Sequence, residues 1–414
     1  MKPVFVVSSF RSSSTWLWGK FRQSEQTLTY YEPFHEGLSH LTQEQAMAIG
    51  PGDWKSGHPE SAPYFLEMIP LLKAEGGVTA FNTSFAFQEF IASNGIDGEL
   101  SKEQLLYVET LLSLAKSRDK TPVLACTRSL GRVAGLKKAF GGVYIFLYRP
   151  MYDHWMSYLS QARAGNTYFI ETTNEILRSN KHDDVIRWIG DRYPISGVGE
   201  ETPDLLTNNF YRHFALHIYL YIVAFEICDI KINVADVSRA RDLGVVAEDA
   251  IADKTGIRVS IHDAERKVES HDFLYSPEEL IEIEQYILDL IKSSVPQRDF
   301  ARDFREDFNR DVSMVKALSG TKLERQLIDN EMQVISAELA RTSEVLRDKI
   351  VEIRLKHHAL AIESNRNASL RNDIEAIRKQ VLSITESRSW RITRPIRFFS
   401  RLWRSCFNSC FGKS

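Results

Sequence analysis

A basic residue followed by a run of hydroxyl side chains interrupts the apolar stretch at the start of the chain. In FVVSSFRSSSTWLWGKF, residues 5–21, Arg11 is followed directly by Ser12, Ser13, Ser14 and Thr15. If residues 5–8 form a strand and residues 16–21 begin a helix, backbone N–H groups and the helix N-terminus point toward one place. That arrangement favours a phosphate or a sulfate. The hydroxyls add donors, and Arg11 adds a forked, charged one. A serine-rich turn that caps a helix would use the same residues without a ligand.

A second basic residue and a second hydroxyl follow a later apolar run. VYIFLYRPMYDHWMSYL, residues 143–159, places Arg149 at the end of an expected strand and Ser157 eight residues further on, on an expected helix. A phosphate monoester carries close to two negative charges. A guanidinium and a hydroxyl two helical turns apart can hold it from two sides. The structural alternative is a strand-end charge and a surface serine.

The first loop lacks the marks of an ATP-binding P-loop. The early glycine and the Gly-Lys-[Ser/Thr] ending are both missing, so Mg-ATP would lose its usual lysine and metal ligand. A phosphate-like ligand that needs no metal fits these residues better. An ATP-dependent, kinase-like enzyme is kept as a rival interpretation.

FRSSSTWL, residues 10–17, resembles the 5′-phosphosulfate loop of sulfotransferases that use 3′-phosphoadenosine 5′-phosphosulfate (PAPS). Arg149 and Ser157 resemble the second nucleotide-binding element of that family. The resemblance implies that PAPS is the co-substrate and that no metal is required. It assigns the 3′-phosphate to Arg149 and Ser157, and the phosphosulfate to Arg11, Ser12, Ser13, Ser14, Thr15 and Trp16.

Ser13 departs from this family, which usually has glycine at that position. A Cβ atom there obstructs the closest approach of the backbone to a phosphate. The alternative from another functional class is therefore a non-catalytic, coiled-coil, membrane-associated scaffold that retains a nucleotide-binding fold.

The stretch YYEPFHE, residues 30–36, supplies candidates for a general base. Carbohydrate and tyrosylprotein sulfotransferases are similar in having a glutamate shortly after the first helix, which assigns the base to Glu32. A carboxylate beside the sulfonate can take the proton of an attacking hydroxyl. His35 competes for this role because its ordinary pKa suits it, and Glu36 is a weaker third candidate. Glu32 capping a turn before Pro33 is the structural alternative.

VLACTRSLGR, residues 123–132, also resembles bacterial members of the family, which carry a Cys-x-Arg-Ser-x-x-Arg pattern between the two nucleotide elements. The resemblance implies that Arg128, at the end of an expected strand, meets the acceptor or the sulfonate. Ser129 and Arg132 are less specific. A strand-to-helix turn with exposed cations explains the same residues equally well.

The composition of the chain describes a soluble globular protein with an appended segment. Its 414 residues are 43% hydrophobic and 26% charged, and the formal charge of −3 argues against a surface that binds nucleic acid. The spacing of Cys126, Cys228, Cys406 and Cys410 indicates neither a disulfide framework nor a zinc site, which fits a reducing cytoplasm. We expect no secretory signal, and the apolar segment 214–228 is too short to span a membrane and predicts a buried helix.

Short apolar runs predict buried parallel strands at residues 3–8, 122–126, 143–148 and 231–234, with helical segments between them. This alternation predicts an α/β fold with a central parallel sheet and helices on both faces. With the family resemblance, it implies a P-loop-like three-layer domain over residues 1–305.

Residues 306–386 predict a long helical coiled coil. Apolar residues recur every seven positions, at Met332, Leu339, Leu346, Ile353, Leu360, Ile374 and Val381, with Ile328, Ile335, Leu370, Ile377 and Ile384 at the complementary d-type positions. The pattern favours a homo-oligomer. One solvated helix lying on the domain is the alternative.

Residues 387–414 form a basic aromatic tail with seven Lys/Arg and no Asp or Glu. Aromatic and arginine residues interleave there, which suits an anionic membrane surface. SRSWRITRPIR, residues 387–397, resembles C-terminal segments of bacterial glycosyltransferases that build cell-surface polysaccharide. Together with YEP, residues 31–33, this implies a glycan or lipid-linked saccharide acceptor and a cytoplasmic protein at the inner membrane face.

Overall fold

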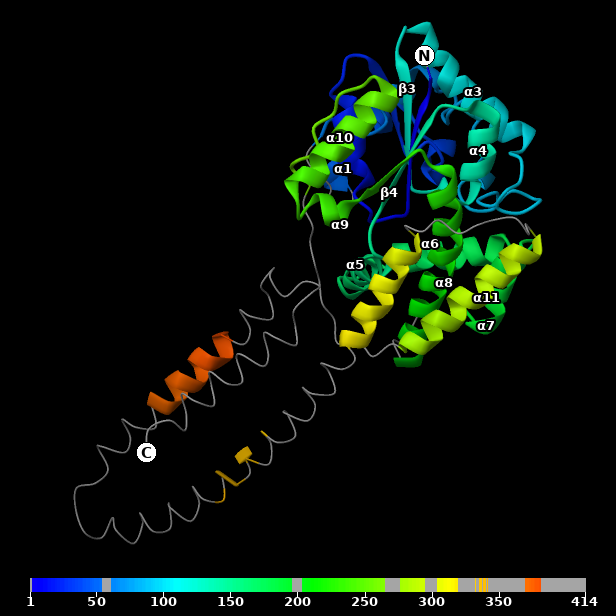
Figure 1. The fold of residues 1–414 in the computed structure, drawn as a ribbon. Helices are drawn as coiled ribbons and strands as arrows, with labels where there is room; N and C mark the ends of the chain where they lie inside the picture. Colours follow the sequence, from blue (N-terminus) through cyan, green and yellow to red (C-terminus); the bar gives the residue numbers. More distant parts are fainter. Residues whose placement is uncertain are drawn as a thin grey trace, which may run out of the picture. The chain divides into compact units, whose positions relative to one another are not determined.

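The computed structural model describes residues 2–53, 61–195, 203–264, 276–294 and 304–318, together with residues 369–380 and scattered residues between 332 and 341. The chain divides into two compact units. The first contains residues 1–271 and 276–312, and the second contains residues 272–275 and 313–414. The candidate site lies in the first unit (Figure 1).

Within the described residues, five parallel strands form one sheet in the order β2-β3-β1-β4-β5. The strands are β1 (Val4–Ser8), β2 (Thr27–Tyr31), β3 (Thr121–Cys126), β4 (Val143–Tyr148) and β5 (Ile230–Asn233). The central strand β1 is buried along its whole length and pairs with β3 on one side and β4 on the other. A strand covered on both faces needs apolar side chains at successive positions, which explains its continuous apolar run.

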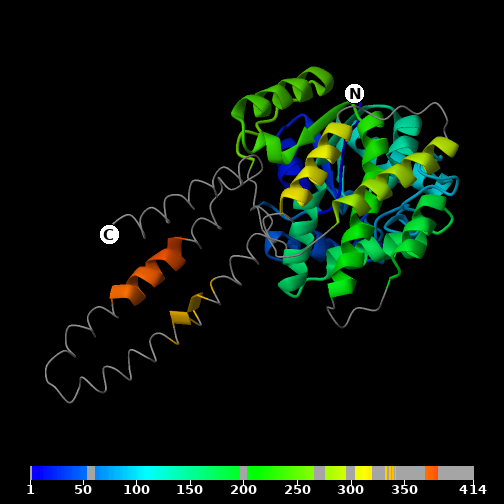
Figure 2. The same cartoon turned by 60° about the horizontal axis from the view of Figure 1, so that its bottom comes forward.

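Helices cover both faces of this sheet (Figure 1 and Figure 2). Parallel crossovers are right-handed, so connections that run in opposite directions along the sheet place their helices on opposite faces. The connection from β1 to β2 therefore puts α1 (Ser14–Arg22) on one face, beside α10 (Arg241–Thr255). The connections that run the other way put α3 (Lys102–Ser117) and α4 (Val133–Phe140) on the opposite face.

The connection from β4 to β5 forms a helical group around a buried helix. Its members are α5 (Met151–Arg163), α6 (Tyr168–Ser179), α7 (Asp184–Arg192) and α8 (Pro203–Ile227), with α11 (Pro277–Ser294) packed on α8. Shorter elements complete the unit: α2 (Gln43–Ala48), α9 (Val234–Val237) and the 3-10 helices η1 (Glu36–Ser39), η2 (Pro51–Asp53), η3 (Leu66–Leu71), η4 (Thr83–Phe85) and η5 (Leu130–Arg132).

The prediction of an α/β fold with a parallel sheet is confirmed. The four predicted strands are present as β1, β3, β4 and β5, and the predicted buried helix at residues 214–228 is part of α8. Strand β2 was not predicted. Its sequence, TLTYY, has one aliphatic residue and follows α1 after only four residues, so it lacks the apolar run that identified the others.

Residues 304–318 are helical, and their first part packs on the first unit beyond the predicted boundary at residue 305. The ring of Phe304 lies 5.8 Å from that of Phe225 in α8, and Asp307 accepts a hydrogen bond from the Tyr148 hydroxyl at 2.6 Å. Asp311 accepts hydrogen bonds from the backbone N–H groups of Met151 and Tyr152, so it caps the start of α5.

Most of the predicted coiled coil, and the whole basic tail at residues 387–414, lie outside the described residues. The described piece at residues 369–380 is helical and exposed throughout. In the described part of the chain, no helix is both long and apolar enough to cross a bilayer.

Candidate functional site

The two sequence motifs lie at the carboxyl ends of neighbouring strands. Strands β1 and β4 are neighbours in the sheet. The connection after β1 runs toward β2, at one edge of the sheet, and the connection after β4 runs toward β5, at the opposite edge. Parallel sheets bind ligands in the crevice that opens where successive connections diverge in this way. The structure therefore brings residues 9–15 and residues 149–157 to the position in the fold where a ligand crevice is expected.

The two motifs exchange hydrogen bonds through their side chains. Arg11 of the first donates from Nε to Ser157 Oγ of the second at 3.1 Å. Arg149 of the second donates from Nη2 to Ser13 Oγ of the first at 2.8 Å. Two guanidinium groups and two hydroxyls, separated by more than 130 residues in sequence, thus share one location. Such a set of donors is suited to an anion with more than one charged group.

Three residues that follow the carboxyl ends of β1 and β2 have a left-handed backbone conformation. The φ angles are 64° at Arg11, 63° at Ser13 and 42° at Glu32, and only two other non-glycine residues of the described chain have positive φ. For an L-residue this conformation costs roughly 1–2 kcal/mol. Strain of this kind gathers at functional sites because the surrounding structure must hold it in place.

The remaining hydroxyls of the loop are enclosed. Ser12 is fully buried, while Ser14 and Thr15 are buried in the first turn of α1. Thr15 Oγ1 lies 2.9 Å from the Tyr31 hydroxyl, which links α1 to the end of β2. Trp16, which the family resemblance also assigned to the co-substrate, donates from Nε1 to Asp263 at the surface.

Glu32 is a buried carboxylate, 4% exposed, held by residues that follow β3. It accepts hydrogen bonds from the backbone N–H of Thr127 at 3.0 Å, from Thr127 Oγ1 at 2.9 Å and from Arg128 Nη1 at 2.9 Å. Burial raises the pKa of Glu32, although Arg128 and Thr127 act in the opposite direction. The carboxyl end of β3 therefore fixes the orientation of this group.

Arg128 is turned inward, with 1% of its side chain exposed. Its Nη2 donates to Glu36 at 2.8 Å and to the Tyr168 hydroxyl at 2.5 Å, in addition to the Nη1 contact with Glu32. Arg128 is therefore a positioning group for two carboxylates, and its contact with an acceptor or sulfonate stays a prediction. The alternative of a turn with exposed cations is wrong, because Ser129 and Arg132 are buried as well.

Aromatic rings connect Arg128, which holds Glu32 and Glu36, to the loop after β1. The Arg128 guanidinium lies 4.9 Å from the ring centre of Phe10, and the Arg11 guanidinium lies 5.4 Å from that of Phe169. Because Phe10 precedes Arg11 and Phe169 follows Tyr168, these contacts place Glu32 and the loop after β1 in one continuous group of side chains.

The other two base candidates differ from Glu32 in the direction of their pKa shifts, because the pKa of Glu32 is raised and theirs are lowered. Burial lowers the pKa of His35 to about 3, and the nearby Arg128 acts in the same direction. Its Nδ1 accepts a hydrogen bond from the Gly37 N–H, so the neutral ring carries its proton on Nε2. Burial favours a higher pKa for Glu36, but Arg128 and His35 outweigh it and lower that pKa to about 2.

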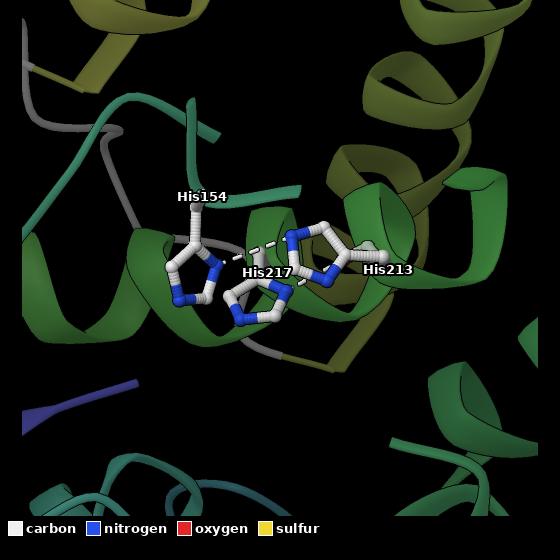
Figure 3. A group of neighbouring side chains, drawn as sticks. All are labelled: His154, His213 and His217. Atoms are coloured by element: carbon white, nitrogen blue, oxygen red, sulfur yellow. Dashed lines mark hydrogen bonds between the residues drawn. The ribbon is translucent and has the colours of Figure 1, made fainter. Parts of the chain in front are cut away.

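Sequence reasoning missed a group of three buried histidines, His154 of α5 with His213 and His217 of α8 (Figure 3). The signal in the sequence was the four-residue spacing of the second pair, which places both rings on one side of a helix. The third ring comes from a helix 59 residues earlier, which no local pattern reveals.

Comparisons of the chain with protein family descriptions, curated proteins and solved structures found no match. The site itself consists of paired cationic and hydroxyl donors at one end and a buried carboxylate at the other.

Proposed function

We propose that the chain is a sulfotransferase that moves a sulfonate group from PAPS to a hydroxyl acceptor, on a P-loop-like α/β domain. The observation that carries this proposal is the mutual contact of the two motifs, in which each arginine donates to the other motif's serine. A bound PAPS would replace these two contacts with contacts to its own phosphate and sulfonate oxygens. The 5′-phosphosulfate is assigned to the loop after β1, and the 3′-phosphate to Arg149 and Ser157.

The proposed reaction is an in-line displacement at sulfur. The acceptor oxygen forms a bond to sulfur while the bond from sulfur to the bridging oxygen breaks, and 3′,5′-adenosine bisphosphate leaves with the electron pair. The acceptor proton goes to Glu32. By analogy with phosphoryl transfer, positioning and charge stabilisation dominate such a step. Arg11 would stabilise the charge that develops on the bridging oxygen.

Glu32 is preferred as the base for reasons of charge and geometry. Its raised pKa brings it closer to neutral pH, where a carboxylate accepts a proton more readily. Glu36 is a much weaker base because of its low pKa, and the accepting nitrogen of His35 is already used by Gly37. Glu32 directly follows β2, so it lies at the same carboxyl end of the parallel sheet as the loop after β1.

The acceptor is proposed from sequence resemblance alone. The YEP stretch and the basic aromatic tail support a glycan or lipid-linked saccharide, a homo-oligomer and contact with an anionic membrane surface. These features also support a cytoplasmic protein that is peripheral on the inner membrane face.

The direct test measures binding of PAPS and release of the bisphosphate by the full-length protein. We expect Arg149→Ala to weaken PAPS binding by at least about tenfold, since a charged hydrogen bond is worth about 1.5–3 kcal/mol. Arg11→Ala should reduce turnover more than binding. Arg163→Ala is the matched control, because this exposed arginine lies at the far end of the same helix α5.

Absence of PAPS binding in the unsubstituted protein would contradict the proposal. One structural feature favours the scaffold alternative in that event: Ser13 combines a left-handed backbone with a side chain where a phosphate should approach. Label transferred from γ-labelled ATP, and not from sulfur-labelled PAPS, would instead identify the kinase-like enzyme.

A further inference from the structure

Three buried imidazole rings lie together between α5 and α8 (Figure 3), and one of them, His154, contacts the backbone carbonyl of Phe10 in the loop that follows β1. The side chains of His154, His213 and His217 are 0%, 1% and 3% exposed. One nitrogen from each ring can be chosen so that all three lie within 4.8 Å of one another. The ring planes are inclined to one another by 32° to 66°. Buried polar groups need partners, so three imidazole rings packed together in the interior need an explanation.

Hydrogen bonds to backbone carbonyls determine which nitrogens hold lone pairs. His154 Nε2 contacts the carbonyl oxygen of Phe10, and His217 Nδ1 lies 2.6 Å from that of His213. A carbonyl only accepts, so both nitrogens carry hydrogen, and the lone pairs lie on His154 Nδ1 and His217 Nε2. Metal-binding histidines characteristically donate their other N–H to a carbonyl or carboxylate, and two of these rings already do so.

The third ring can adopt the same arrangement by a change of tautomer. His213 Nε2 lies 3.1 Å from His154 Nδ1, and since that atom holds a lone pair, the proton between them belongs to His213. Moving this proton to His213 Nδ1 frees Nε2 as a ligand. His213 Nδ1 is a buried nitrogen without a hydrogen-bond partner among the described residues, so no existing hydrogen bond opposes this transfer.

All three rings are uncharged at neutral pH. Burial lowers the pKa of His217 to about 4, and it lowers the pKa values of His154 and His213 well below the ordinary range. Neutral imidazole is the form that binds a metal ion.

The distances and the adjacent space also suit a tetrahedral ion. Two nitrogens that are each about 2.0–2.1 Å from a tetrahedral Zn²⁺ are separated by about 3.3 Å. His154 Nδ1 and His213 Nε2 are 3.1 Å apart, and one nitrogen from each of the three rings lies within 4.8 Å of the others, so an ion would draw the rings closer together. A cavity of about 20 Å³ is lined by His217, Tyr158 and Ser9, among others. That volume is enough for one water molecule, and His217 is the member of the histidine group that lines the cavity.

We propose that His154, His213 and His217 bind one divalent transition-metal ion, with Zn²⁺ as the best fit and water as the fourth ligand. Imidazole is a ligand that zinc favours. The ion would join α5 and α8, and through His154 and Phe10 it would hold the start of the loop after β1. Arg11 and Arg149 oppose positive charge near His154, so we expect weaker binding than at a closed four-ligand zinc site. This proposal does not depend on the proposed function.

The experiment treats the full-length protein with a chelator, removes the chelator and titrates with Zn²⁺ and Co²⁺. Equilibrium dialysis gives the metal bound per chain, and the visible spectrum of the Co²⁺ form reports coordination geometry. We expect one ion per chain, intense bands typical of tetrahedral Co²⁺ that Zn²⁺ abolishes, and no effect of Mg²⁺. His154→Gln, His213→Gln and His217→Gln should each weaken binding by at least about tenfold.

His182→Gln is the matched control, since His182 also contacts a backbone carbonyl, that of Ala92 at 3.0 Å, but lies outside the group. It should bind like the unsubstituted protein. Failure of the unsubstituted protein to bind Zn²⁺ or Co²⁺ would overturn the proposal without any variant. So would a Co²⁺ spectrum typical of six-coordinate ions that none of the three substitutions changes, because that result indicates surface binding. Circular dichroism confirms that each variant is folded.

Discussion

Ser13 shows why the loop after β1 is unusual at the level of a single residue. It forms the N-cap position of α1, with φ 63° and ψ 26°, and its side chain accepts from Arg149 instead of capping the helix. Glycine reaches this conformation without a steric penalty. The preference for glycine in the resembling family thus has a physical explanation, and serine at this position stores strain.

Two substitutions at Ser13 separate this strain from the hydroxyl contact. Ser13→Gly and Ser13→Ala both remove the bond with Arg149, but only glycine relieves the left-handed backbone. We expect the glycine variant to be more stable than the alanine variant by about 1 kcal/mol in urea unfolding. The same two substitutions at Ser160, within α5, should rank in the opposite order, because glycine is disfavoured inside a helix. Equal stability of the two Ser13 variants would argue against the strained loop.

Glu32 and His35 make distinct predictions for catalysis. We expect Glu32→Gln to reduce turnover by about 10²–10⁴-fold with little loss of PAPS binding, since the amide cannot accept the proton. His35→Gln should retain most of the activity. Because burial raises the pKa of Glu32, the rate should fall on acidification at a pH above the ordinary glutamate value of about 4.3.

The measurement is kcat against pH for the unsubstituted protein and both variants, with sulfonate transfer to the acceptor as the readout. An inactive His35→Gln protein beside an active Glu32→Gln protein would reverse the assignment of the base.

At the level of elements, α5 depends on a carboxylate from a distant part of the chain. Asp311, in the helical residues 304–318, accepts from the first N–H groups of α5, which begins directly after Arg149 and Pro150. Burial raises the pKa of Asp311 to about 7, although the same N–H groups favour the charged form. Desolvation therefore outweighs the favourable field at the helix N-terminus.

This balance predicts how stability depends on pH. The folded-state pKa of Asp311 lies above the unfolded value of about 3.9, so folding favours the protonated carboxyl. Its contribution is complete below that value and is lost as pH rises through about 7. We expect Asp311→Asn, which keeps an accepting oxygen, to lose less stability than the unsubstituted protein between pH 5 and 8 in urea unfolding.

Asp263→Asn is the control for that experiment. Asp263 is half exposed and pairs with Lys20, and hydrogen bonding to Lys20 and Trp16 outweighs burial and lowers its pKa. It therefore stays charged throughout this pH range, and its substitution should leave the slope unchanged. A slope in Asp311→Asn equal to that of the unsubstituted protein would exclude Asp311 as the titrating group.

The elements were predictable from the sequence to different degrees. Strands β1, β3, β4 and β5 were found within one residue at each end because buried parallel strands need apolar runs. Strand β2 was missed because it consists mainly of threonine and tyrosine and lacks an aliphatic run. It is buried throughout, and the ring of Tyr31 packs against that of Trp18 in α1.

The residues of the candidate site were also predictable only where a local pattern existed. Local spacing singled out Arg149 and Ser157, but no local pattern shows that Arg128 turns inward or that His154 contacts His213.

At the level of the whole molecule, the described helical residues 369–380 present an apolar stripe to solvent. Leu370, Ile374 and Ile377 are 54%, 59% and 52% exposed and occupy the predicted a and d positions. We expect Leu370→Glu with Ile377→Glu, in the full-length protein, to reduce the oligomer to a smaller species in light scattering. Charges at these positions oppose helix association.

Asn372→Glu with Ala376→Glu is the matched control, because it adds the same charge to the same helix at predicted f and c positions. It should leave the oligomeric state unchanged. A protein that is monomeric before any substitution would refute the coiled-coil prediction.

The order of strands in the sheet has a consequence for synthesis of the chain. Val4 in β1 pairs with Val123 in β3 and with Val143 in β4, so the first strand made is the one that waits longest for both neighbours. During translation its apolar residues stay unsatisfied until more than a hundred further residues have left the ribosome, a period in which an unpaired strand is prone to aggregate. A nascent chain that ends before residue 143 lacks β4 and, with it, Arg149 and Ser157, so we expect protection of β1 by a chaperone to raise the yield of folded protein.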